Sequence, residues 1–168
     1  DTSGMLGAGN AVRVIPLTGT RIYDSRSIGK LASGTSRDIQ VRGVAGVPPT
    51  ATAVVVNLTV TNVTGTGYLT AHAGGTGVPG TSNLNFLAGQ TKARLAIVPL
   101  DTAGRMRITT GGASSENVIV DVQGYLEPAG TTNTGRTFAT EGGHSRLLDT
   151  TTAAPLAAGA SVCLDMYA

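Results

Sequence analysis

Residues 52–62 read Thr-Ala-Val-Val-Val-Asn-Leu-Thr-Val-Thr-Asn, and this stretch decides the fold. In an extended chain Val54, Val56, Leu58 and Val60 point to one side, while a more polar set points to the other. A period of two is typical of a β-strand with one face in a hydrophobic core. The sequence therefore predicts a strand over residues 52–62.

The same alternation recurs along the chain, separated by short stretches rich in glycine and proline. No window keeps the spacing of three and four residues that an amphipathic helix needs. The further predicted strands are residues 11–15, 20–24, 37–42, 67–73, 83–87, 93–100, 105–110, 117–126, 145–149 and 161–166. Strands at regular spacing with short turns favour antiparallel sheets packed face to face. We predict an all-β, jelly-roll-like antiparallel β-sandwich with extra strand-forming arms at both termini.

The composition narrows the classes of function. The chain has 168 residues, 40% of them hydrophobic, which is enough to build the core of a domain. Its basic residues are scattered and its net charge is only +2, so binding to nucleic acid is not expected. The apolar runs are too short to span a membrane. With only 13% charged residues, the surface is rich in hydroxyl groups, as is common outside cells. We expect an extracellular or cell-surface protein.

An internal repeat is the second strong signal. Residues 21–25 (Arg-Ile-Tyr-Asp-Ser) and 31–36 (Leu-Ala-Ser-Gly-Thr-Ser) return as residues 146–150 (Arg-Leu-Leu-Asp-Thr) and 156–161 (Leu-Ala-Ala-Gly-Ala-Ser). Two matching blocks one domain apart indicate one complete unit followed by the opening of a second.

This repeat sets the predicted domain boundaries. We predict an N-terminal strand arm at residues 1–16, a core β-sandwich module at 17–127, a linker at 128–135 and a C-terminal arm at 136–168, which begins the second repeat. The linker is small, polar and free of periodicity.

The repeated block also carries a charged pair. Arg21 precedes Asp24 by three residues, and Arg146 precedes Asp149 by the same distance. An Asp after a short strand can accept backbone N–H bonds and lock a turn, and the Arg can pair with it. Because the pair occurs twice, a structural role in the turn is favoured over a catalytic one.

Taken together, several segments resemble a repeat module of secreted, multidomain proteins from actinobacteria and some other bacteria. The module's usual pattern is Arg-Leu-Leu-Asp-Thr-Arg, Gly-Val-Pro, Ala-Val-Val-Leu-Asn-Val-Thr-Val-Thr, Gly-Tyr-Leu-Thr, Ser-Asn-Leu-Asn and Val-Asp-Val-Gln-Gly-Tyr-Phe. The matching residues are 21–26, 46–48, 53–61, 67–70, 82–85 and 120–126. The chain departs from the pattern at Ile22-Tyr23 and at Leu126. The resemblance implies an extracellular all-β module with no catalytic residues of its own.

Residues able to support catalysis or bind metal are few. The chain has two histidines, His72 and His144, and a single cysteine, Cys163, so it offers no zinc motif and no intrachain disulfide. Cys163 is either a small buried residue or a thiol that links neighbouring subunits. A calcium site at Asp121 is a weaker alternative, because no loop shows the alternating acidic pattern. We expect no catalytic residue, metal or cofactor.

Two polar residues interrupt apolar strands. Asn57 follows three valines and Asp121 lies between Val120 and Val122. Buried polar groups must be hydrogen-bonded, so we expect a buried polar network across the sheets. Its expected members are Asn57, Asn83, Asn85, Asp121 and Gln123.

The favoured function is assembly. We predict a noncatalytic secreted module whose copies join head to tail into a filament or surface fibre, so that its main partner is a copy of itself. An arm at residues 7–15 or 160–168 would add as a strand to a neighbour's open sheet edge. The arms present Val12 and Val14 at one end and Val162 and Leu164 at the other.

The alternative is an accessory module that binds a polysaccharide. Sugar rings stack on aromatic side chains, but the chain has no Trp and only two Phe and four Tyr. Tyr68 and Tyr125 are the expected glycan contacts, with Tyr167 as a further candidate.

Overall fold

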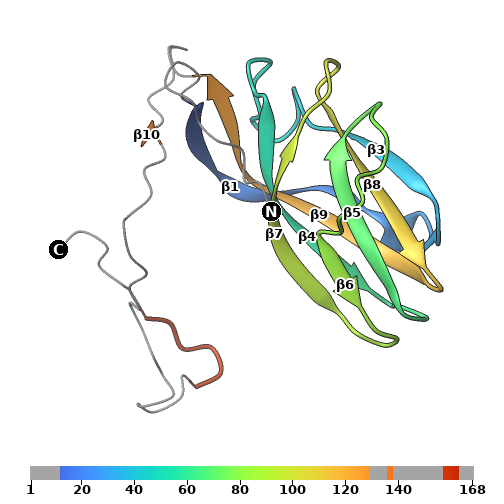
Figure 1. The fold of residues 1–168 in the computed structure, drawn as a ribbon. Helices are drawn as coiled ribbons and strands as arrows, with labels where there is room; N and C mark the ends of the chain where they lie inside the picture. Colours follow the sequence, from blue (N-terminus) through green and yellow to red (C-terminus); the bar gives the residue numbers. More distant parts are fainter. Residues whose placement is uncertain (1–11, 129–135, 138–156, 163–168) are drawn as a thin grey trace. The chain divides into compact units, whose positions relative to one another are not determined.

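A computed structural model gives the fold, and it describes residues 12–128, 136–137 and 157–162 (Figure 1). The chain divides into two units, residues 1–138 and residues 139–168. The first unit holds every strand of the described ranges. Within those ranges, no helix has the length and apolar character that crossing a membrane requires.

The first unit is built from strands and one short 3-10 turn, η1 (Ser25–Ser27). The strands are β1 (Val12–Asp24), β2 (Leu31–Ala32), β3 (Ser36–Gln40), β4 (Ala53–Thr61), β5 (Gly67–Ala73), β6 (Leu84–Phe86), β7 (Lys92–Pro99), β8 (Arg105–Gly112), β9 (Ser115–Pro128) and β10 (Arg136–Thr137).

These strands form two antiparallel sheets that pack together, which confirms the predicted all-β sandwich. The first sheet has the order β10-β1-β9-β4-β7, with β2 also paired to β9, and the second sheet has the order β3-β8-β5-β6. The pairs are nested: β1 pairs with β9, β3 with β8, β4 with β7 and β5 with β6. Such nesting is the arrangement of a long hairpin wrapped into a jelly roll.

The core lies between the two sheets, as the alternation in residues 52–62 predicts. In β4 the inward residues from Val54 to Val60 are completely buried. Leu69, Met106 and Ile108 of the second sheet are also completely buried and belong to the same cluster. The strand predicted over 52–62 is therefore confirmed, with bounds one residue shorter at each end.

The N-terminal strands differ from the prediction. The segments expected separately at residues 11–15 and 20–24 are parts of one strand, β1, from residue 12 onward. Irregular pairing with β9 between Pro16 and Thr20 makes the gap that the sequence presents as a turn. Residues 12–16 of the expected arm thus belong to the first sheet of their own chain.

The C-terminal half of the prediction is described only in part. Pro128, the expected start of the linker, is the last residue of β9. Residues 129–135 and the expected strand at 145–149 lie outside the described residues. Of the strand expected at 161–166, Ser161 and Val162 are described and are not in a strand.

The repeat is visible in the backbone as well as in the sequence. Gly34 has a φ of 75°, and the N–H of Thr35 donates to the carbonyl of Ala32 over 3.1 Å. At the equivalent positions Gly159 has a φ of 80°, and the N–H of Ala160 donates to the carbonyl of Ala157 over 3.0 Å. A left-handed φ favours glycine, so the repeated Gly is required by the turn.

Candidate functional site

The repeated Arg-x-x-Asp block locks the end of β1 onto β9. The Asp24 carboxylate accepts the backbone N–H of Arg26 over 3.0 Å and its guanidinium over 2.7 Å. These bonds hold the pKa of Asp24 well below its usual range. Arg21 lies 3.3 Å from Asp24 and donates to Asp121 over 2.8 Å. Arg146 and Asp149 lie outside the described residues.

A buried polar cluster follows this block directly, and the sequence did not point to it. The Ser25 hydroxyl accepts the N–H of Val118 over 2.8 Å, and the Asn117 amide donates to the Ser25 carbonyl over 3.0 Å. Asn62 donates to Asn117 over 3.1 Å. Ser25 is completely buried. The one signal in the sequence was the hydroxyl kept in the repeat, where Thr150 follows Asp149.

The polar network predicted from the sequence does not form. Asn57 and Asp121 face each other across β4 and β9 on the outer face of the first sheet, where they are half-buried. Gln123 and Asn85 are exposed. Asn83 accepts the N–H of Ala71 over 2.7 Å in the second sheet. Because the valines beside Asn57 and Asp121 fill the inward positions, these two polar residues lie on the outer face and are not enclosed in the core.

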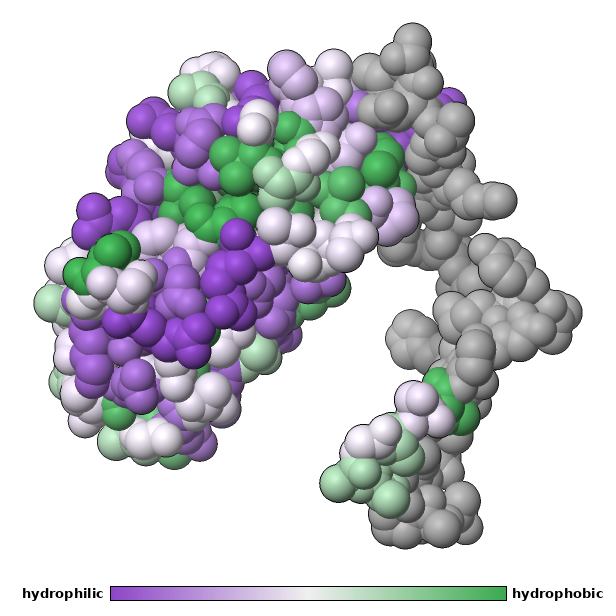
Figure 2. Space-filling view, turned by 180° about the vertical axis from the view of Figure 1, so that it is seen from behind, coloured by the Kyte–Doolittle hydropathy of each residue, from purple (hydrophilic) through white to green (hydrophobic). Residues whose placement is uncertain are grey.

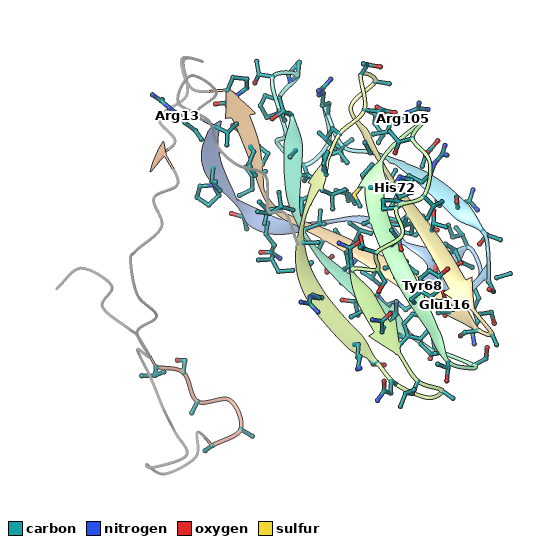
Figure 3. All side chains as sticks on the ribbon, viewed as in Figure 1. Arg13, Tyr68, His72, Arg105 and Glu116 are labelled. Carbon is teal, nitrogen blue, oxygen red and sulfur yellow. The ribbon has the colours of Figure 1, made fainter. Side chains whose placement is uncertain are left out.

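The two tyrosines proposed as glycan contacts have different environments. Tyr125 is 4% exposed and belongs to the core, so it cannot stack on a sugar. The cause is a bulge at Gln123: Val122 pairs with Val56 and Gly124 with the adjacent Val55, so Gln123 is an extra residue in β9. After the bulge, the residues of β9 that face the core are the odd-numbered ones, including Tyr125. Tyr68 lies in β5 (Figure 3), and its side chain is 41% exposed.

His72 has structural partners. It lies in β5 and is buried (Figure 3), and its Nε2 lies 3.3 Å from the hydroxyl of Thr109. Its Nδ1 lies 3.0 Å from the hydroxyl of Thr76 and the carbonyl of Ala73. None of these bonds joins it to a carboxylate. His144 lies outside the described residues. In the part of the chain that the structure describes, no group of three His, Cys, Asp or Glu residues could hold a metal ion.

The outer face of the first sheet is the strongest candidate for an interaction surface. The register places apolar residues in two adjacent rows across four strands. They are Val14, Leu126, Ala53 and Pro99 in one row, and Pro16, Gly124, Val55 and Ile97 in the next. Seen from behind, the molecule carries a band of hydrophobic residues beside a hydrophilic area (Figure 2). The sheet therefore presents an apolar face to solvent.

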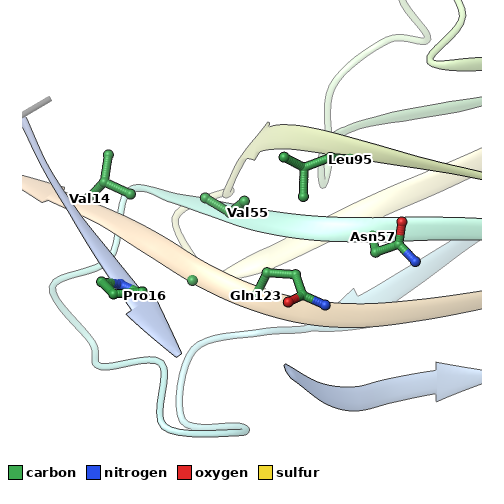
Figure 4. Close-up of a pocket in the computed structure, with 7 residues that line it drawn as sticks. Val14, Pro16, Val55, Asn57, Leu95 and Gln123 are labelled. Carbon is green, nitrogen blue, oxygen red and sulfur yellow. The ribbon is translucent and has the colours of Figure 1, made fainter. Parts of the chain in front are cut away.

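A shallow hollow of about 420 Å³ lies on this face (Figure 4). Its lining residues are Val14, Pro16, Val55, Asn57, Leu95, Gln123 and Gly124. The Gly124 position has no room for a side chain, because a Cβ would lie 2.6 Å from the carbonyl oxygen of Ile15. The close approach of β1 and β9 at this glycine thus forms the floor of the hollow.

The apolar face ends at an open edge. No described strand pairs with the outer side of β7. Leu95 and Ile97 of β7 are 61% and 58% exposed. An exposed, apolar edge strand is a template for pairing with another chain. We call β7 together with the two apolar rows the edge surface.

The assembly residues predicted from the sequence are placed in part. Val12 and Val14 are half-buried in β1, where they pair with Pro128 and Leu126 of β9. Val162 is 48% exposed. Leu164 lies outside the described residues. The N-terminal candidates are thus already paired within their own chain.

Comparison of the sequence with models of protein families gave no match, and no curated protein matches it either.

Proposed function

We propose that this chain is a noncatalytic structural module, secreted or exposed at a cell surface, whose copies join through the edge surface into a filament or fibre. The observation that carries the proposal is the exposure of Leu95 and Ile97 on β7, whose outer side pairs with no other strand of the described residues. Folded proteins protect such edges with charge, proline, bulges or a covering segment. A second copy of the chain would supply that cover.

The other sheet edges are poorer templates. In the described part of the chain, β6 has only three residues and β3 only five. β1 pairs irregularly with β9 on one side, and β10 covers part of its other side. β7 has eight residues and pairs with β4 without interruption from Val60 to Ala53. It is therefore the edge best suited to accept another strand.

The occupant we infer is the segment 160–168 of a second copy. Its sequence, Ala-Ser-Val-Cys-Leu-Asp-Met-Tyr-Ala, alternates apolar residues at 162, 164 and 166. The other predicted arm is less suitable, since residues 12–15 already pair with β9. Charge also matches: β7 contains two basic residues and no acid, while the segment contains one acid and no base.

One antiparallel register satisfies both the apolar and the charged residues. When Leu164 is opposite Leu95, Val162 falls opposite Ile97 and Asp165 falls opposite Arg94. In this register Val162 extends the apolar row of Ile97 and Val55, Leu164 packs beside Leu95, and the ion pair lies on the other face of the new strand. Strand addition from one end of a copy to the edge of the next is a head-to-tail contact, which propagates without closing.

Sedimentation velocity of the full chain tests the proposal. We expect large assemblies for the wild type and monomers for Ile97→Lys, because a lysine on the edge strand opposes strand addition. Leu164→Lys, on the added segment 160–168, should also give monomers. Val78→Lys is the matched control, since Val78 is 52% exposed but lies outside β7.

The proposal fails if the wild type sediments as a monomer at every concentration. It also fails if Ile97→Lys and Val78→Lys assemble equally well, because assembly would then use another surface.

A further inference from the structure

A second surface groove lies beside the other sheet and reaches Lys92 at the start of β7. It is a hollow of about 410 Å³ beside β5 and β6. Tyr68, Asn85 and Lys92 supply its aromatic and polar groups, with the hydroxyl of Thr66 and the exposed Leu87 at its rim. Pockets of this volume accommodate small ligands.

The Tyr68 ring is held in place by glycine. Tyr68 pairs with Gly111 of β8, and a Cβ at Gly111 would collide with the ring, coming within 2.7 Å of its Cε1 atom. The ring therefore rests against bare backbone on one side, and the side chain is still 41% exposed. A ring fixed in this way loses little freedom when a ligand stacks on its open face.

Two further glycines, Gly67 and Gly112, allow the strands beside the groove to approach closely. A Cβ at Gly67 would lie 2.6 Å from the carbonyl oxygen of Gly111 and 2.8 Å from Cε2 of Phe86. At Gly112 a Cβ would lie 2.6 Å from Cα of Gly67, and its φ of 101° is unfavourable for other residues. Gly67, Gly111 and Gly112, which lie beside Tyr68 and Phe86, thus have no room for a side chain.

The polar groups of the groove include a single charge, which is positive. Lys92 is exposed and donates one hydrogen bond, to the carbonyl of Asn85 over 3.2 Å, so its ammonium keeps further donors. Asn85 lies opposite Tyr68 in β6, and its Oδ1 accepts the hydroxyl of Ser82 over 2.8 Å. A ligand that fits combines a flat apolar ring face, hydroxyl groups and a negative charge.

We propose that this groove binds an acidic polysaccharide, with the C–H face of a pyranose ring on Tyr68 and its carboxylate at Lys92. Sugar hydroxyls would meet Asn85 and Thr66. The stacking contact supplies most of the apolar burial, and the charge-assisted hydrogen bond selects an acidic sugar over a neutral one.

Binding of the full chain to immobilised oligosaccharides tests this assignment. The probes are β-linked oligomers of glucuronate and of glucose, equal in length. We expect binding of the glucuronate oligomer, about tenfold weaker for Tyr68→Ala and unchanged for Tyr68→Phe. Lys92→Met should weaken binding and reduce its salt dependence. Lys30→Met, which removes the same charge outside the groove, should bind as the wild type does.

The measurement is repeated in the Ile97→Lys background, so that assembly does not add avidity. If Tyr68→Ala does not fold, the comparison of Lys92→Met with Lys30→Met tests whether the groove is the binding site. The proposal is overturned if the wild type does not bind the glucuronate oligomer, if the glucose oligomer binds equally well, or if folded Tyr68→Ala and Lys92→Met bind as the wild type does.

Discussion

The hydroxyl of Ser25 accepts a hydrogen bond from the backbone N–H of Val118, 93 residues further along the chain and 2.8 Å away. Ser25 is completely buried, so water does not replace this bond. Together with the Arg21–Asp121 pair, it fastens the repeated block to β9. At residues 21–25 the block therefore ties the end of β1 to β9 within the first sheet.

Ser25→Ala should destabilise the fold by about 1–3 kcal/mol, because it removes the acceptor of a buried N–H. Denaturant unfolding measures the change, in the Ile97→Lys background so that assembly does not affect the result. Ser27→Ala is the control: Ser27 is exposed, and its hydroxyl bonds only to the Asp24 carbonyl over 3.3 Å. Equal losses for the two variants would contradict the anchoring role.

Glu116 should weaken the fold at neutral pH. Glu116 lies in β9 (Figure 3). Its side chain is completely buried, and neither carboxylate oxygen has a hydrogen-bond partner in the described part of the chain. Burial raises the pKa of Glu116, against the smaller opposing effects of Ser114 and Lys30. The charged form is therefore disfavoured in the folded state, and stability falls as pH rises from the unfolded pKa through the folded one.

Glu116→Gln should accordingly be more stable than the wild type at pH 7, by about 1–3 kcal/mol. The difference should vanish below the ordinary glutamate pKa of 4.5, where Glu116 is protonated in both the folded and the unfolded state. Unfolding curves recorded across this pH range measure it. A gain that is independent of pH would show that the carboxylate charge is not the cause.

Asp38 should behave in the opposite sense. Arg107 donates to its carboxylate over 2.6 Å and 2.8 Å and holds the pKa of Asp38 below its usual value. The folded state thus favours the charged form, and this contribution is present above the unfolded pKa and lost as pH falls. Asp38→Asn should destabilise the protein at pH 7 and have less effect in acid. The same unfolding curves report it, and a loss that grows in acid would contradict the pairing.

Gly67→Ala should destabilise the fold by about 1–3 kcal/mol, because its Cβ would press on the backbone of Gly111 and the buried ring of Phe86. Gly77→Ala is the matched control, since a Cβ at Gly77 meets nothing within 4 Å. Thermal melting of the two variants measures the difference. Similar melting temperatures would mean that the strands can move apart at Gly67 without cost.

The sequence predicted the sandwich because strand periodicity depends on neighbours in the chain. Residues 54–60 alternate without interruption, and β4 follows them. The interior polar groups depend instead on pairing between distant segments. Asn117 is buried beside Ser25, while Asn57 lies on the outer face of the first sheet. The residues next to each asparagine in the sequence do not reveal this difference.

Bulges limited the prediction of the candidate sites. Continuing the alternation of Val118, Val120 and Val122 places Tyr125 on the outer face. The extra residue at Gln123 turns Tyr125 into the core instead. Such a bulge is defined by the partner strand, so the sequence of β9 alone does not reveal it.

The proposed register of segment 160–168 on β7 places Cys163, the single cysteine, opposite Ala96 of the neighbouring copy. Opposed residues of antiparallel strands lie within the Cα separation that a disulfide spans. Ala96→Cys should therefore form disulfides between copies. Its controls are Ala96→Cys with Cys163→Ser, which lacks the partner thiol, and Ala93→Cys, which lies three residues out of register.

Non-reducing gel electrophoresis of oxidised Ala96→Cys is the most direct test of assembly through β7. A ladder of covalent multimers is predicted, absent when Cys163 is replaced and weak for Ala93→Cys. The proposed contact between copies would be contradicted if Ala96→Cys stays a monomer, with or without a disulfide inside the chain. It would also be contradicted if Ala93→Cys gives a stronger ladder than Ala96→Cys.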